Sequence, residues 1–295
     1  MSDNDQTSGA GGKEIDFVLY YYEPALAASI TSTVVFAILT ALHIWRLLRA
    51  KAYYFTAFTV GGLFQVIGYA FRIWGHFNPE SVMAFAIQGT FILVAPALFA
   101  ASIYMILGRL IRTCRAEHLS LIPVNWVTRI FVLGDVIAFT VQASGAGLSA
   151  AGDYDLFKLG EKVIIGGLFV QIVFFGFFVC TSVLFQHRLT RSPTPVSIEG
   201  RLPWKRHLYV LYGTSAIILV RSIFRVVEYI QGNDGYLITH EVYLYIFDAL
   251  LMAAVMAIFV VWYVGDLESK KKRKAANLDS LHSSDEIVEM GRRDA

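Results

Sequence analysis

The chain has 295 residues, of which 56% are hydrophobic and only 16% carry a formal charge, and its mean hydropathy is +0.55. Length alone would suggest two soluble domains, but this composition excludes them and favours a protein that crosses a membrane several times. The formal net charge of +2 gives no indication of a nucleic-acid partner, and none is predicted.

Seven stretches of about 20 apolar residues, the length that crosses the hydrocarbon core of a bilayer, follow one another along the chain. They are Ala25–Trp45, Ala52–Trp74, Val82–Leu107, Pro123–Ala146, Lys162–Phe185, His207–Ile230 and Glu241–Val264. The connections are short, so helices that are neighbours in sequence should pack antiparallel. We therefore predict an all-α fold, a polytopic bundle of seven transmembrane helices, with one membrane domain over residues 21–266.

The flanking segments and the loops predict an orientation. Residues 1–20 are rich in Gly, Ser and Asp and are expected to be disordered, and residues 267–295 form a basic and then polar tail. One set of loops, together with the tail, holds 18 Lys and Arg residues against three on the opposite side. The positive-inside rule then predicts an extracellular N-terminus and a cytoplasmic C-terminus. The run Lys270–Lys274 suits a stop-transfer anchor that also contacts anionic lipid headgroups.

Charged side chains interrupt the sixth stretch, where Arg221, Arg225 and Glu228 share one helix face at the spacing i, i+4, i+7. Each charge costs roughly 2.5–3.5 kcal/mol at mid-bilayer, so such residues persist where they meet partners or a wet cavity. Candidate partners on other stretches are Arg72, Asp135, Glu241 and Asp248. Three arginines against four carboxylates leave one carboxylate without an arginine.

Neutral polar residues follow the same stripes. Asp135 and Gln142, like Gln65 and Arg72, are seven residues apart, and Tyr245 lies between Glu241 and Asp248. Further polar residues within the spans are Gln88 and Gln171. Because most of these side chains fall in the predicted outer half of the bundle, we expect them to converge on one substrate or translocation site. The alternative is a structural network that only fixes helix register.

Other chemistries are weakly represented. The seven histidines are scattered along the chain and do not converge with carboxylates, so no metal and no cofactor are predicted, and the protein is not expected to be an enzyme. No nucleotide-binding motif stands in a suitable context. A seven-helix receptor or lipid sensor is the main alternative, although the motifs of rhodopsin-like receptors are missing. An intramembrane lipid hydrolase is a further, weaker alternative.

Seven short motifs occur in order, each in or just before its own helix. They are Tyr22-x-Pro24; Gly68-Tyr69-x-x-Arg72; Ala95-Pro96 with Ala100-Ala101-x-x-Tyr104; Asp135 with Gln142-x-x-Gly145-x-Gly147; Gly167-Leu168-x-x-Gln171; Arg221-Ser222-x-Phe224-Arg225-x-x-Glu228; and Glu241-x-x-x-Tyr245-x-x-Asp248. With these motifs, residues 20–266 resemble the fungal seven-helix lipid-translocating exporters. That family includes aminocholesterol-resistance proteins, a sphingoid long-chain-base exporter and a protoporphyrin-uptake relative.

The resemblance implies a function. It suggests translocation of amphiphilic lipids, such as sphingoid long-chain bases or toxic sterol-like compounds, at the plasma membrane or alternatively the vacuolar membrane. The expected partners are then membrane lipids and an amphiphilic small-molecule substrate. One residue departs from the family pattern, because Gln65 stands where the family commonly has Glu. This difference removes a charge and weakens the case for a proton relay at that position.

Overall fold

A computed structural model describes residues 26–78, 81–149, 154–198, 204–231 and 241–262. The predicted N-terminal segment, residues 1–20, and the tail, residues 267–295 with its basic run, lie outside the described residues. In the described ranges every regular element is a helix, and no strand occurs.

The helices follow the predicted order. Their bounds are α1 Leu26–Ala50, η1 Tyr53–Phe55, α2 Thr56–Phe77, α3 Val82–Thr113, η2 Glu117–Leu119, α4 Val124–Ser149, α5 Tyr154–Arg191, α6 Pro195–Ile198, α7 Trp204–Gln231, α9 Glu241–Leu244, η3 Tyr245–Leu250 and α10 Leu251–Val261. Within the described part of the chain, seven segments are long and apolar enough to cross a bilayer, the last being formed by α9, η3 and α10 together. The predicted all-α fold with seven membrane spans is confirmed.

The predicted spans differ from the observed helices mainly at their ends, and most at α5. This helix begins eight residues before the predicted Lys162 and ends six residues after the predicted Phe185. At 1.5 Å per residue it is about 57 Å long, well beyond the roughly 30 Å hydrocarbon core. Both ends of α5 contain charged residues but are still helical. A search for apolar stretches therefore finds only the middle of this helix.

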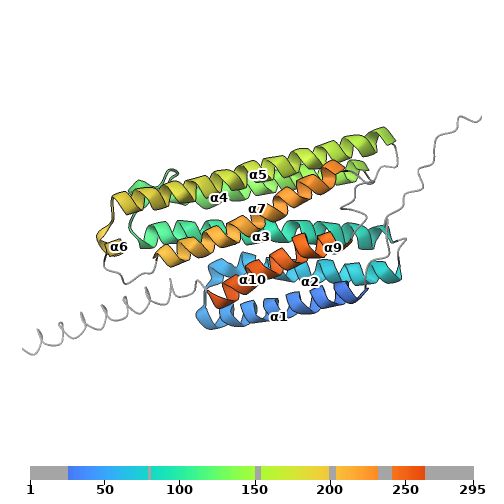
Figure 1. Ribbon diagram of the computed structural model, residues 1–295, viewed down its shortest axis with the longest axis horizontal. Coiled ribbons are helices and arrows are strands. Elements are labelled where there is room, and N and C mark those ends of the chain that lie inside the picture. Colours follow the sequence, from blue (N-terminus) through green and yellow to red (C-terminus); the bar gives the residue numbers. More distant parts are fainter. Residues whose placement is uncertain (1–25, 79–80, 150–153, 199–203, 232–240, 263–295) are drawn as a thin grey trace, which may run out of the picture.

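The helices form a bundle in two groups (Figure 1). On one side α4 packs against α5, and on the other α1 packs against α2, while α3 and α7 lie between the two groups. Helix α3 packs on α2 and α4, and α7 packs on α5 and α10. The span of α9, η3 and α10 packs on α7 and α1. We call the end of the bundle where α2 ends and α9 begins the α9 end, and the opposite end, beside α6, the α6 end.

Glycines allow close approach at the helix crossings. A Cβ at Gly68 of α2 would lie 2.6 Å from Ile92 of α3, and one at Gly134 of α4 would lie 2.4 Å from the Phe174 ring of α5. Without a driving hydrophobic effect in lipid, small residues of this kind let helices associate through dense packing. A larger side chain at either position would force the facing Ile92 or Phe174 side chain, or the helix that carries it, to shift.

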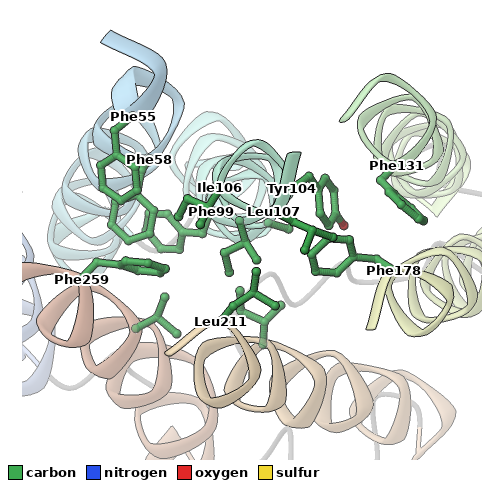
Figure 2. Close-up of a cluster of buried hydrophobic side chains, with 14 of the residues drawn as sticks. Phe55, Phe58, Phe99, Tyr104, Ile106, Leu107, Phe131, Phe178, Leu211 and Phe259 are labelled. Atoms are coloured by element: carbon green, nitrogen blue, oxygen red, sulfur yellow. The ribbon is translucent and has the colours of Figure 1, made fainter. Parts of the chain in front are cut away.

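Aromatic and aliphatic side chains fill the middle of the bundle (Figure 2). Phe55, Phe58 and Phe99 pack with Phe259 on the α2 and α10 side. A second aromatic group, drawn in the same view, joins α3 to α4 and α5 through Tyr104, Phe131 and Phe178. Leucine and isoleucine side chains, among them Ile106, Leu107 and Leu211, lie between these two groups. The polar residues are therefore set in a dry, closely packed frame.

Candidate functional site

A buried carboxylate, Asp248, binds two arginines of α7. Arg221 donates from Nε to Oδ1 of Asp248 at 2.6 Å, and Arg225 donates from Nη2 to Oδ2 at 2.5 Å. Asp248 is fully buried, and the Arg221 side chain is only 2% exposed. The spacing of the two arginines, one helical turn apart, lets them reach both oxygens of one carboxylate.

The helix that carries Asp248 is locally π-helical. Residues Tyr245–Leu250 form η3, a π-helical segment between the α-helical turns of α9 and α10. A π-bulge widens the helix and rotates the side chains on either side of it relative to each other, and such bulges occur often at functional sites. Here the bulge coincides with the residue that binds two arginines.

Arg221 has a second partner that depends on a proline. Its Nη2 donates to the main-chain carbonyl of Ile92 on α3 at 3.1 Å. In a regular helix that carbonyl would accept from the amide four residues later, but this position is Pro96, which has no N–H. Because an unpaired carbonyl is costly in the membrane interior, the guanidinium replaces the missing amide. Arg221 thus ties α3, α7 and η3 together.

A second group of contacts, at the α9 end of the bundle, joins α1 and α2 to α9 and η3. Arg72 of α2 donates to Oε1 of Glu241 at 2.6 Å and to the Tyr245 hydroxyl at 3.0 Å. The Tyr245 hydroxyl in turn donates to Oε1 of Glu241 at 3.0 Å and lies 2.8 Å from the Ser29 hydroxyl of α1. The Arg72 side chain is 2% exposed, so this pair is buried almost as deeply as the first.

We call the six charged residues of these two groups, together with Tyr245, the arginine network. Its members are Arg72, Arg221, Arg225, Glu228, Glu241 and Asp248. Three arginines and three carboxylates give a formal charge of zero. Exposure divides the members into a deep part and a rim: Arg225 and Glu241 are 12% exposed and Glu228 is 10% exposed, whereas the others are almost fully buried. Arg225 donates to Oε2 of Glu228 at 2.9 Å.

Asp135 does not join this network, and the expectation that all seven charged residues converge is wrong for this residue. Its Oδ2 accepts from the Tyr104 hydroxyl of α3 at 3.0 Å, while its Oδ1 has no hydrogen-bond partner among the described residues. On α3, Tyr104 lies about 18 Å along the helix axis from Ile92, toward the α6 end. The buried face of α4 packs mainly on α3 and α5, whereas the arginines project from α2 and α7.

Of the four predicted glutamines, Gln65, Gln88 and Gln142 are buried and Gln171 is partly buried, and a hydrogen bond joins Gln142 to Gln171. Gln142 of α4 donates to Oε1 of Gln171 on α5 at 3.2 Å, and its own Oε1 has no partner among the described residues. Gln65 is fully buried on α2, and neither its amide nitrogen nor its amide oxygen has a partner in the part of the chain that the structure describes. Gln88 is buried on α3, where this helix crosses Gly68 of α2.

Three participants escaped the sequence prediction: the Ser29 hydroxyl, the Tyr104 hydroxyl and the Ile92 carbonyl. A serine or tyrosine in a span carries no signal of its own, because such residues are common in membrane helices. The carbonyl could have been found, since an intrahelical proline always frees the carbonyl four residues before it. In the described ranges no group of three or more His, Cys, Asp or Glu side chains is placed to hold a metal ion.

The fold and the network define a class, an integral membrane protein of seven helices with a charge network buried within the bundle. The family model described as RTA1 like protein matches residues 58–271, and the chain belongs to this family. The resemblance drawn from its motifs is therefore confirmed.

Three relatives from Saccharomyces cerevisiae show the similarity. Protoporphyrin uptake protein 1 is 37% identical over 281 residues, which cover 83% of this chain and 91% of that protein. Protein RTA1 is 37% identical over 270 residues, covering 83% and 84%. Sphingoid long-chain base transporter RSB1, from strain Lalvin EC1118, is 30% identical over 276 residues, covering 82% and 72%. No solved structure matches the chain significantly.

Proposed function

We propose that this protein translocates amphiphilic lipids, such as sphingoid long-chain bases or toxic sterol-like compounds, across a membrane, and that the arginine network engages the polar head of the substrate. The observation that carries the proposal is the network itself, six charged side chains buried in two groups of ion pairs, each of which includes a residue of the span formed by α9, η3 and α10. Charged side chains inside membrane spans mark substrate and ion pathways because their burial is otherwise costly.

The rim of the network is where a head group would first compete for partners. Arg225, Glu228 and Glu241 are 10–12% exposed, whereas Asp248 beneath them is fully buried. An ammonium group can replace a guanidinium as partner of Glu228 or Glu241, and a phosphate or carboxylate can replace a glutamate as partner of Arg225.

The outer faces of the bundle suit a lipid tail that stays in the bilayer while its head crosses. Exposed side chains along α1, α4 and α5 are apolar, as Ile38, Leu133 and Val173 illustrate. A structural role alone would need only one or two pairs to fix helix register. Here one carboxylate binds two arginines, and a third arginine pairs beside it.

The relatives support this proposal, since the matched proteins include one named as a sphingoid long-chain base transporter and one named as a porphyrin uptake protein. The names of these two relatives describe transport or uptake, so we propose a transporter without enzymatic activity. The plasma membrane is the proposed location, in agreement with the expectation from the sequence, and the vacuolar membrane is the alternative.

The test is movement of a fluorescently labelled long-chain base across the membrane of proteoliposomes that contain the purified protein. We expect Arg225→Ala and Asp248→Asn to lower the rate at least tenfold. Arg129→Ala is the matched control, because Arg129 is exposed on α4 and lies over the Trp126 ring, away from the network. Elution as a single symmetric species shows that each variant is folded.

Two results would count against the proposal. If both folded variants move the base as fast as the wild type, the network is structural and not a substrate site. If the wild-type protein binds the base but moves no amphiphile at all, the alternative of a lipid sensor is favoured over a transporter.

A further inference from the structure

Asp135 is the one buried carboxylate in the described part of the bundle that lies outside the arginine network. It is 6% exposed, and its only hydrogen bond in that part of the chain is the one it accepts from Tyr104. Its Oδ1 is buried and unpaired. Buried polar atoms almost always have partners, so an unpaired carboxylate oxygen in a membrane span points to a group that binds there.

No cation in the described residues is placed to neutralise Asp135. The other charged side chains of α3, α4 and α5 lie toward the helix ends: Arg109, Arg112, Arg129, Asp155, Lys158, Glu161, Lys162, His187, Arg188 and Arg191. Arg129 of α4 is exposed, and Arg109 lies over the Tyr54 ring at 3.7 Å. On α7, which packs on α3 and α5, Arg221 is bound to Asp248 and Ile92. The titratable group that faces Asp135 from α3 is Tyr104. Between Lys162 and His187, the only titratable side chain of α5 is the thiol of Cys180.

The surroundings of the pair suit an organic cation. The ring of Tyr104 packs against Phe178 at 4.5 Å, Phe131 at 5.4 Å and Phe175 at 6.1 Å between centroids. Figure 2 shows this aromatic group between α3, α4 and α5. A carboxylate beside aromatic faces attracts an ammonium ion through the charge and through the ring quadrupoles together. Farther along α4, the unpaired Oε1 of Gln142 is a second acceptor without a donor.

We propose that Asp135 is a cation site at which a lipid-soluble ammonium ion and a proton compete. An ionised carboxylate buried without a partner is very costly, so the positive charge must come from one or the other. In the exchange the ammonium amphiphile binds the carboxylate as an ion pair and the carboxyl proton leaves for water. One positive charge enters as one leaves, and no bond other than O–H is broken.

This inference rests on the proposed transport function and adds a chemical class of substrate and a source of energy. A site that holds either a proton or an ammonium ion, but not both, couples the movement of one to the opposite movement of the other. A proton gradient across the membrane could then drive amine-bearing lipids out. The arginine network lies about 18 Å away along the axis of α3. It would therefore meet the head group at a different stage of its passage than Asp135 does.

The test is binding of radiolabelled tetradecyltrimethylammonium to the purified, detergent-solubilised protein from about pH 5 to about pH 8. This probe carries a permanent charge, so its own protonation contributes nothing. We expect the apparent affinity to rise about tenfold per pH unit until the carboxyl is ionised and then to level off. In weakly buffered solution, binding at the lower pH should release about one proton per probe, seen with a pH-sensitive dye.

The variants separate the site from its surroundings. Asp135→Asn should bind weakly and without pH dependence, whereas Asp135→Glu, which keeps the carboxyl, should retain the dependence. Glu117→Gln, which removes an exposed acid from η2, should behave as the wild type does. If Asp135→Asn fails to fold, the wild-type curve still decides, because a flat curve without proton release overturns the inference.

The two proposals fail in different ways. If the protein still transports the labelled base but binds the probe equally at every pH, only the cation site at Asp135 is contradicted. If binding of the probe is linked to proton release but the protein moves no lipid, the proposed transport function is contradicted and the cation site is supported.

Discussion

The two buried charge sites of this protein balance their charges in opposite ways. In the arginine network every carboxylate has a guanidinium within hydrogen-bond distance, and the formal charge sums to zero. At Asp135 the only partner in the described residues is the neutral hydroxyl of Tyr104. A site that is neutral in itself is stable while empty, whereas a site with an uncompensated charge needs a bound ion. Removing one charge should therefore have opposite consequences at the two sites.

The largest effect is expected for Arg221→Met. The substitution leaves Asp248 with one arginine and the Ile92 carbonyl with none, and unpairing a buried ion pair costs about 3–5 kcal/mol. The free energy of unfolding in detergent micelles, followed by circular dichroism, measures the loss. Arg129→Met, on the exposed face of α4, should change it by less than about 0.5 kcal/mol. A loss below about 1 kcal/mol for Arg221→Met would contradict the account of the network.

A double substitution sharpens the same comparison. Arg72→Met and Glu241→Leu should each destabilise the protein, because each strands the charge of its partner. Together they should cost less than the sum, with a coupling of about 1–3 kcal/mol, since the double variant leaves no unpaired charge of this pair. Strict additivity of the two single costs would show that Arg72 and Glu241 do not depend on each other in solution.

Asp135→Asn should be nearly neutral for stability, within about 1 kcal/mol of the wild type or slightly more stable. The amide oxygen can still accept from the Tyr104 hydroxyl, and no cation loses its partner. The matching change in the network, Asp248→Asn, weakens two arginine contacts and should destabilise clearly. The same unfolding assay, applied to Asp135→Asn and Asp248→Asn, measures the difference between the two sites. Equal losses of stability in both variants would contradict it.

The smallest effect is expected at Gln65, which lies in neither site. Its amide is fully buried, and both polar atoms lack partners among the described residues. Methionine has a similar shape without the amide, so Gln65→Met should raise the free energy of unfolding by about 1 kcal/mol. A clear loss of stability would instead indicate that an internal water bonds to this amide.

Much of the fold could be predicted from the sequence because the signals for it are local. The length of each apolar stretch defines a span, and the spacing of Arg221, Arg225 and Glu228 defines a face. The six charged residues other than Asp135 lie in two groups of ion pairs, whereas one convergent site was expected. The error at Asp135 is not local, because the face of α4 that bears it was identified correctly but not the helices that this face meets.

Which helices meet depends on packing between distant residues. The fit of Gly134 against the Phe174 ring brings α4 onto α5, and nothing in the spacing of polar residues reports this fit. The π-helical turn at Asp248 is similar, since it changes the direction of side chains without any change in composition. The charge count did hold a correct hint, because it left one carboxylate without an arginine.

The bond from Arg221 to the Ile92 carbonyl makes the energetic effects of substitutions at positions 96 and 221 depend on each other. An alanine at position 96 would supply the amide that the carbonyl lacks and so displace the guanidinium from it. A change at position 221 alone would leave that carbonyl bare in the lipid-embedded core. Because both changes act on the same carbonyl, the double substitution should cost less than the sum of the two single ones, although the loss of the Asp248 contact remains.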